Sequence, residues 1–297
     1  MVVFNLWWNY MACEQPKSWD YYSSGGTAGT FGTPEVKDPV QGRFLNNCSL
    51  IAAFASLAWK GKVSTQPAGP AYTYTFQFYG NPTGSQKTDG KLPLDSTGKL
   101  MHAKSDTPTE IWPALYEKAY YQWLDKLGPD NASARPDYCR HTEFQSPVTV
   151  LSQLTGKEVK QKSCAGADTV FSDIDAFCAN CGRSTTNRAI NFPAVAWTYD
   201  PAVSNPNNAA YSDTTIKGHH TYSLLGVAGK KDANGKWTER YVVLRNPYGI
   251  GKGDPKMDGL YTGALWCNNI NFGAADGIFA LRIDLFVKYF AGYAWVI

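Results

Sequence analysis

The sequence has few histidines, no long apolar run and no long block of like charge. Only four of its 297 residues are histidine. No apolar run reaches the roughly 18 residues that a membrane-spanning helix needs, so we expect no membrane span. The formal net charge is +3, from 28 Lys+Arg against 25 Asp+Glu, and the two signs are interspersed. This balance predicts neither a nucleic-acid nor a membrane-surface partner.

The N-terminal stretch lacks the basic region that opens a secretory signal peptide, so the sequence does not distinguish a cytoplasmic from a secreted protein. Cysteine is present seven times, an odd count. In an oxidising compartment this count predicts one functional thiol and up to three disulfides. No EF-hand loop pattern occurs in the chain, which leaves it without that calcium site.

Cys48 stands in a setting that can activate a thiol. It precedes an almost wholly apolar stretch, Ser49 to Trp59, which predicts a helix buried on all sides. Asn46 and Asn47 are good residue types for the N-cap. A thiol in the first helical turn faces unpaired backbone N–H groups and the positive end of the helix dipole, which favours the thiolate. A packed, unreactive thiol is the other interpretation of this stretch, because free cysteine is commonly buried.

Gln41, seven residues before Cys48, favours the catalytic interpretation. The amide of a glutamine can complete an oxyanion hole together with the backbone N–H of the cysteine. A cysteine nucleophile then needs a histidine and a group that orients it, both far along the chain.

The order of predicted elements indicates an α+β protein. The first half carries a strand over 71–79 and helices near 111–123 and 148–154, after a Gly/Ser/Thr/Pro-rich lead-in over 14–40 that we expect to be loosely packed. The second half carries strands near 192–199, 221–228 and 240–245. We therefore expect two subdomains, divided between about Lys160 and Arg188, with a site in the cleft between them.

The histidine partner of Cys48 is expected at His219 or His220, which begin a predicted strand. His102 lies in a charged loop and His141 lies beside Cys139. Asn246 ends a neighbouring strand, where its side-chain carbonyl could accept the imidazole N–H and fix the ring tautomer.

Four segments, in this order, resemble the calpain family of papain-like cysteine proteases. The first is QGRFLNNCSLIAAFASLA, from Gln41 to Ala58, which resembles the nucleophile motif. The other three are Leu92–Leu100 with Glu110–Tyr120, Gly218–Ser223, and Arg245–Gly249. The third resembles the family's Gly-His-Ala-Tyr-Ser motif, so the following Tyr-Ser assigns the catalytic role to His220. The fourth resembles Arg-Asn-Pro-Trp-Gly. The resemblance covers roughly residues 38–290.

The resemblance implies a papain-like cysteine protease fold and a cysteine endopeptidase acting through Cys48, His220 and Asn246, with Gln41 in the oxyanion hole. We expect an N-terminal extension over 1–37, a helical subdomain with the nucleophile over 38–175, and a strand-rich subdomain with histidine and asparagine over 176–297. The substrate would be a protein or peptide, bound in extended form. We expect a monomer without a cofactor.

Four departures from the family pattern stand out. The spacing from Gln41 to Cys48 is one residue longer than usual, Ser49 replaces a Trp, and Tyr248 replaces the Trp that shields the His–Asn hydrogen bond. The loop over 250–256, which is acidic in calcium-activated members, here carries Lys252 and Lys256 with one carboxylate between them. Because Ca²⁺ prefers several oxygen ligands, we predict no calcium site there and a calcium-independent protease.

Cys178 and Cys181 form a CxxC pattern that leaves several interpretations open. They could be a redox pair, half of a structural zinc site with Cys139, His141 and Cys164, or members of disulfides. The function also has alternatives. The first is a catalytically silent papain-like module that binds a peptide or protein, and the second is acyl transfer to an amine by the same three residues.

Overall fold

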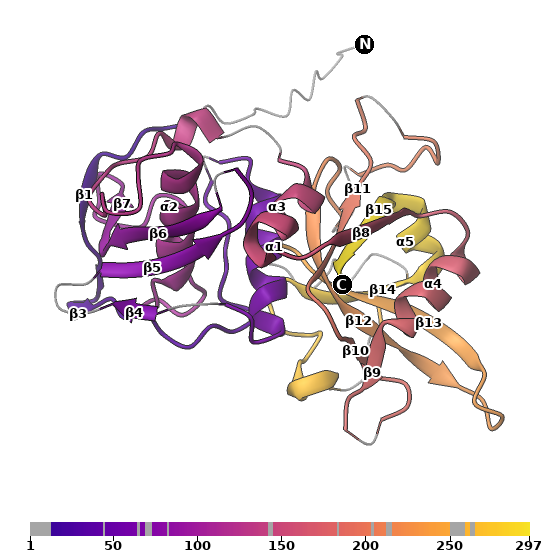
Figure 1. Ribbon diagram of the computed structural model, residues 1–297. Helices are drawn as coiled ribbons and strands as arrows, with labels where there is room; N and C mark the ends of the chain where they lie inside the picture. The colour runs from indigo at the N-terminus through magenta and orange to yellow at the C-terminus, as the bar shows by residue number, and fades with distance from the viewer. Residues whose placement is uncertain are drawn as a thin grey trace, which may run out of the picture.

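The computed structural model describes residues 13–43, 45–63, 66–68, 73–81, 83–141, 145–182, 184–202, 205–211, 216–249, 259–261 and 265–297. It is a mixed α and β structure (Figure 1). No helix among the described residues combines the length and the apolar character that a membrane crossing requires.

Helix α1 (Cys48–Trp59) runs through the middle of the molecule, between the helices of the first part and the large sheet of the second (Figure 1). Residues 48–58 are all buried, as the apolar stretch predicted. Alanine and serine side chains are small, so neighbouring elements can approach the helix closely on every side. The helix contacts α2, α3, β11 and β12.

The first part packs aromatic side chains of helix α2 against α1 and a three-stranded sheet. The ring of Tyr116 stacks on Phe54 of α1 with centroids 4.4 Å apart, and on Phe76 of β5 at 4.7 Å. The helical elements here are α2 (Trp112–Leu124), η1 (Tyr138–His141) and α3 (Pro147–Thr155). The strands of this sheet are β4 (Gln66–Ala68), β5 (Thr73–Phe78) and β6 (Gly84–Asp89).

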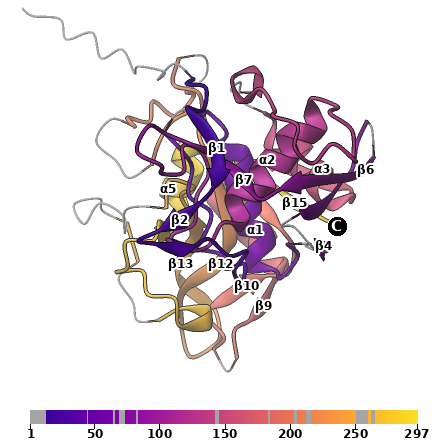
Figure 2. The ribbon, with the colours of Figure 1, turned by 90° about the vertical axis from the view of Figure 1, so that its left-hand side faces the viewer.

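The lead-in is more ordered than its Gly/Ser/Thr/Pro-rich composition predicted. Strand β1 (Ser18–Tyr21) pairs antiparallel with β7 (Lys91–Leu94), and the two strands lie side by side in Figure 2. Short strands β2 (Ser23–Ser24) and β3 (Thr27–Ala28) form a second pair. A disulfide joins Cys13 to Cys139 of η1. The pairing of β1 with β7 and the disulfide are non-local contacts that hold the lead-in against the first part, and local composition gives no sign of them.

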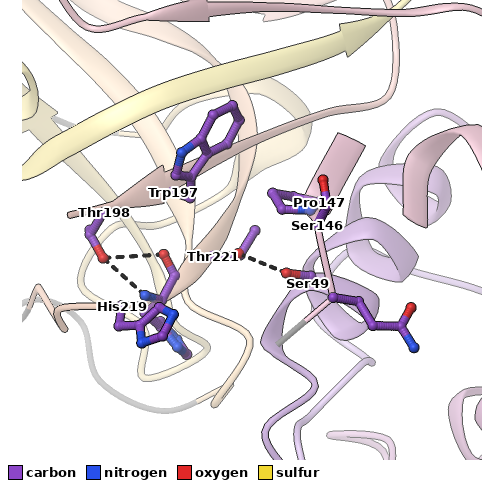
Figure 3. A pocket seen from close by; sticks show the side chains of 9 residues that line it. Ser49, Ser146, Pro147, Trp197, Thr198, His219 and Thr221 are labelled. Atoms are coloured by element: carbon purple, nitrogen blue, oxygen red, sulfur yellow. Dashed lines mark hydrogen bonds between the residues drawn. The ribbon is translucent and has the colours of Figure 1, made fainter. Parts of the chain in front are cut away.

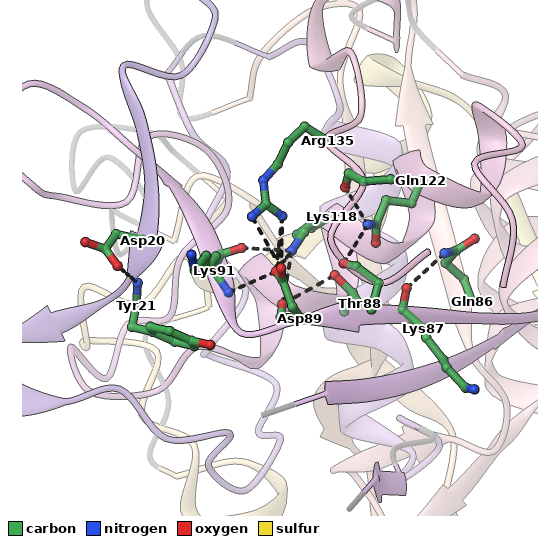
Figure 4. Close-up of polar contacts among 12 residues, drawn as sticks. Asp20, Tyr21, Gln86, Lys87, Thr88, Asp89, Lys91, Lys118, Gln122 and Arg135 are labelled. Carbon is green, nitrogen blue, oxygen red and sulfur yellow. Dashed lines mark hydrogen bonds and ion pairs between the residues drawn. The ribbon is translucent and has the colours of Figure 1, made fainter. Parts of the chain in front are cut away.

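Beneath β1, a buried ion pair ties α2 to the end of β6 (Figure 4). Lys118, whose side chain is fully buried, donates to a carboxylate oxygen of Asp89 and to the backbone oxygens of Asp89 and Lys91. Arg135 adds hydrogen bonds of 3.1 and 3.3 Å to the same carboxylate and lies over the ring of Trp19. All three donors of the lysine therefore have acceptors, as a buried cation requires.

The second part is an eight-stranded antiparallel sheet with the order β14-β13-β12-β11-β15-β8, to which β10 and β9 are added beside β12. The hairpin of β12 and β13 turns at Asp232-Ala-Asn-Gly, a sequence typical of hairpin turns, between two of the expected strands. The strands are β8 (Val159–Ser163), β9 (Cys178–Asn180), β10 (Arg188–Ile190), β11 (Ala194–Thr198), β12 (Thr221–Lys231), β13 (Trp237–Arg245), β14 (Ile278–Arg282) and β15 (Phe290–Val296). The helical elements here are α4 (Ala167–Ala176), α5 (Ile283–Tyr289) and η2 (Cys267–Asn269).

The CxxC pattern is neither a redox pair nor half of a zinc site in this structure. Cys181 forms a disulfide with Cys267 of η2, whereas Cys178 is a buried free thiol that donates to the carbonyl of Ile174 at 3.1 Å. Within the described ranges, no three His, Cys, Asp or Glu side chains come together so that they could hold a metal ion. The loop over 250–256, for which we predicted no calcium, lies outside those ranges.

Candidate active site

Cys48 is the first residue of α1, and its side chain points into the interior. Asn47 occupies the N-cap position, as expected, but its side chain makes no capping hydrogen bond. Instead, its Nδ2 donates to Oε1 of the buried Glu117 at 2.6 Å and to the hydroxyl of Tyr121 at 3.1 Å. Cys48 itself is only 2% exposed. The loop before the nucleophile is therefore anchored to α2.

The helix start favours the thiolate locally, as expected, but burial of the side chain acts against it. Burial raises the pKa of the Cys48 thiol above its ordinary value, while hydrogen bonding by the backbone and side chains of Thr221 and Ser49 acts in the opposite direction. Removal from water destabilises the thiolate by more than these hydrogen bonds stabilise it. In this buried geometry the balance therefore favours the thiol over the thiolate.

His220 precedes β12 and is held on both its backbone and its ring. Its backbone N–H donates to Oγ1 of Thr198 at 3.0 Å, and Nε2 lies 3.0 Å from Oδ1 of Asn246. His220 is 5% exposed, and burial lowers the pKa of its ring to about 4 against the opposing effect of the Asn246 hydrogen bond. An amide oxygen can only accept, so Nε2 carries the hydrogen and Nδ1 is the basic nitrogen of a neutral ring.

Asn246 and Tyr248 enclose this imidazole. The backbone N–H of Asn246 donates to the carbonyl of Gly277 at 2.9 Å, and its Oδ1 also accepts from the backbone N–H of Tyr248 at 3.0 Å. The ring of Tyr248 stacks on that of His220, with centroids 4.7 Å apart and planes 26° from parallel. The side chain of Tyr248 is 37% exposed, so it covers His220 on the side facing water.

Gln41 lies beside this group but its amide is turned towards its own loop. The backbone N–H of Gln41 donates to the carbonyl of Pro247 at 2.8 Å, and Nε2 donates to the carbonyl of Leu45 at 2.7 Å. Gly42, the next residue, lies so close to the backbone of His102 that an added Cβ would be 2.5 Å from its Cα. This close approach explains the glycine of the Gln-Gly pair and fixes the loop that leads to Cys48.

The other histidines lie elsewhere. His219 has a positive φ of 49° and directs Nδ1 towards Asp200 at 3.3 Å. His102 is buried and stacks on Tyr138, and His141 is bonded to Asp125 at 2.8 Å. Among the described side chains, the His220 ring is the imidazole that meets Asn246.

A pocket of about 290 Å³ opens beside His220 (Figure 3). Its wall combines polar side chains with the indole of Trp197 on one side and Pro147 on the other. The lining residues are Ser49, Gln145, Ser146, Pro147, Trp197, Thr198, His219, His220 and Thr221. The sequence identified His220 and Ser49, but not Trp197 or Gln145–Pro147. Which strand residues face a cleft depends on how distant segments pack, and the sequence carries no local signal for it.

A cysteine at the start of a buried helix, with a histidine bonded to an asparagine amide on the adjoining sheet, is the residue set of the cysteine-type hydrolases. The sequence pattern of the calpain family cysteine proteases matches residues 30–261. The chain therefore belongs to the calpain family of cysteine proteases, in agreement with the resemblance of its motifs.

A curated relative agrees with this assignment. The chain is 25% identical over 278 residues to a thiol protease of Porphyromonas gingivalis (strain ATCC BAA-308 / W83), a match that covers 85% of this chain and 53% of the relative. The chain thus spans about half the length of that relative.

Proposed function

We propose that this chain is a cysteine endopeptidase that hydrolyses peptide bonds through Cys48, His220 and Asn246. The observation that carries the proposal is the buried 3.0 Å contact between His220 Nε2 and Asn246 Oδ1, because it leaves Nδ1 as the nitrogen that can take a proton. Thr221, the next residue after His220, hydrogen-bonds with Ser49, the next residue after Cys48. The nucleophile and the base therefore belong to elements that touch each other.

The fold that we propose is papain-like, with a helical subdomain for the nucleophile and a strand-rich one for histidine and asparagine. The sequence suggested 1–37, 38–175 and 176–297 as the divisions. Strand β8 pairs with β15, and α4 contacts β10, β12 and α5. We therefore draw the boundary between α3 and β8, near Gly156. The substrate would be a protein or peptide lying extended along the junction, with one side chain in the pocket beside His220.

In the mechanism, Nδ1 of His220 takes the proton of the Cys48 thiol as the sulfur attacks the peptide carbonyl. The resulting imidazolium protonates the leaving amine as the C–N bond breaks, and a thioester remains. Water, deprotonated by Nδ1, then hydrolyses the thioester and restores the thiol. The developing oxyanion would be held by the backbone N–H of Cys48 and by the second hydrogen of Gln41 Nε2, since the first is bonded to Leu45.

We also propose that this chain acts as a monomer, without a cofactor and without calcium. Lys252 and Lys256 oppose a divalent cation in the loop that is acidic in calcium-activated members.

A catalytically silent binding module is the second candidate. The 2% exposure of Cys48, the raised pKa of its thiol and the engaged amide of Gln41 favour it. Acyl transfer to an amine uses the same residues as hydrolysis. It would be recognised by a new amide bond in the product instead of a free carboxylate.

The test is labelling of the folded protein with an epoxide inactivator of cysteine proteases, with and without a calcium chelator, followed by mass-spectrometric mapping. We expect one adduct, on Cys48, that survives chelation and is absent from Cys48→Ala. Cys164 and Cys178 serve as internal controls, since both are free thiols, buried like Cys48, that lie outside the proposed site. Absence of any adduct in folded protein would favour the silent module, and labelling that chelation abolishes would refute calcium independence.

A further inference from the structure

Two hydroxyl groups meet immediately beside the proposed nucleophile and base. Ser49 follows Cys48 on α1, and Thr221 follows His220 at the start of β12. Their hydroxyl oxygens lie 3.0 Å apart (Figure 3), and both residues are 3% exposed. The pair therefore spans the contact between the helix that carries the cysteine and the strand that follows the histidine.

The number of hydrogens in this pair has a chemical consequence. Each hydroxyl has one hydrogen, and their mutual hydrogen bond uses one of the two. The other hydrogen remains for a third acceptor. Cys48 directly precedes Ser49 in the chain, and the side chains of both Ser49 and Thr221 act to lower the pKa of its thiol. Whichever hydroxyl donates to the other, one hydrogen is left for a third acceptor beside Cys48.

Two further hydroxyl bridges join α1 to the sheet, but they lie farther along the helix. Ser223 Oγ donates to the carbonyl of Ala52 at 2.7 Å, and the backbone N–H of Ala194 donates to Ser56 Oγ at 2.6 Å. Positions 49, 52 and 56 share one helical face, so all three bridges dock the helix. Of the three, the bridge between Ser49 and Thr221 is the one formed by the residues that directly follow Cys48 and His220.

We propose that Ser49 and Thr221 are positioning residues that hold the Cys48 sulfur against the strand after His220 and direct one hydroxyl hydrogen at it as negative charge develops. This inference rests on the proposed function of Cys48 as the nucleophile. Where the family motif has an indole after the cysteine, this chain has a hydrogen-bond donor. A hydrogen bond to a charged acceptor is stronger than one to a neutral acceptor, so the pair stabilises the thiolate more than the thiol.

The test is the pH dependence of Cys48 alkylation by iodoacetamide, read as the modified Cys48 peptide by mass spectrometry. The variants are Ser49→Ala, Thr221→Val and the double variant, with Thr221→Ser as the conservative replacement. Ser223→Ala is the matched control, because it removes a buried hydroxyl bridge between the same two elements without touching the sulfur. Thermal unfolding of each variant reports whether it is folded.

Each single variant keeps one hydroxyl that can turn to the sulfur, so we expect a small fall in the rate at neutral pH. The double variant loses both donors and should react about tenfold more slowly at pH 7, with its pH profile moved to higher pH. Thr221→Ser and Ser223→Ala should follow the wild type. The positioning role of the pair would be overturned if the double variant had the wild-type pH profile, or if the profile of Ser223→Ala shifted as far as that of the double variant. Neither outcome would contradict the proposed function of Cys48. A wild-type Cys48 that is not alkylated at any pH would overturn the proposed function as well.

Discussion

The ring of His220 is enclosed by Asn246 at Nε2, by Tyr222 edge-on and by Tyr248 face-on. Burial lowers its pKa to about 4, and Tyr248 is the part of this enclosure that faces water. In the sequence, Tyr248 replaces the Trp that shields the His–Asn hydrogen bond in the family motif. In this chain the phenol ring of Tyr248 stacks on the imidazole of His220. It therefore covers the group that the Trp of the family motif is expected to shield.

Replacement of Tyr248 by Ala should admit water to the imidazole and raise the pKa of His220 towards its ordinary value. The neutral form that accepts the thiol proton would then be scarcer in acid. The activity at pH 5, divided by the activity at pH 7, should fall by up to about twentyfold, the value for a full return of the pKa from about 4 to 6.5. The measurement is the pH profile of kcat/KM on a peptide substrate. Tyr248→Phe keeps the ring and should keep the wild-type acid limb, so an equal shift in both variants would contradict the shielding role.

Glu117 is a second buried group with a perturbed pKa, and it lies behind the nucleophile loop. Its carboxylate accepts from Asn47 Nδ2 and from the backbone N–H of Ala103, and it faces the phenols of Tyr121 and Tyr138. Burial raises its pKa to about 7. Because the folded-state pKa lies above the unfolded value of about 4.5, its contribution to stability is complete below pH 4.5 and is lost as the pH rises through 7.

Glu117→Gln should therefore flatten the pH dependence of stability between about pH 4.5 and 7, since the amide stays neutral. The measurement is the melting temperature across this pH range. Glu14→Gln, at an exposed site, is the control and should leave the wild-type slope unchanged. A wild-type slope that persists in Glu117→Gln would show that another group titrates.

At the scale of elements, the sequence predicted well what local periodicity controls. The apolar stretch gave α1, helical spacing gave α2, and turn residues separated β12 from β13. Strand β1 escaped prediction because its partner, β7, is about 70 residues away in the chain. The direction of the Cys48 pKa shift could not be predicted from the sequence for a related reason. The helix start is local and visible in the sequence, whereas the burial that outweighs it is a property of the whole fold.

The ion pair between α2 and β6 gives a prediction at this scale. Asp89→Ala leaves the ammonium of Lys118 buried without its carboxylate (Figure 4), and we expect a loss of about 3–5 kcal/mol in the free energy of unfolding. Urea unfolding measures it. Asp130→Ala removes an exposed carboxylate paired with Lys87 on the adjacent surface and should change stability by no more than about 1 kcal/mol. Similar losses in the two variants would refute the distinction between the buried and the exposed pair.

At the scale of the whole molecule, the two disulfides join segments that are 126 and 86 residues apart. Cys13–Cys139 anchors the lead-in to the first part, and Cys181–Cys267 joins the loop after β9 to η2. Disulfides are typical of oxidising compartments, and we therefore expect the folded chain in such a compartment, where Cys48 must stay reduced. Its burial protects it, because oxidation follows thiolate character and exposure.

The double variant Cys181→Ser/Cys267→Ser should lose about 2–5 kcal/mol in the free energy of unfolding, mainly because its unfolded chain regains the freedom of a long loop. Urea unfolding of this variant, and of wild type with and without dithiothreitol, measures the effect. Cys164→Ser is the control, since it changes a buried free thiol and closes no loop, so dithiothreitol should destabilise it as much as wild type. Neither disulfide includes Cys48, so epoxide labelling of Cys48 should persist in the double variant at low denaturant. A variant as stable as wild type would mean that packing alone holds these segments, and loss of labelling in a folded variant would mean that the disulfide also shapes the site.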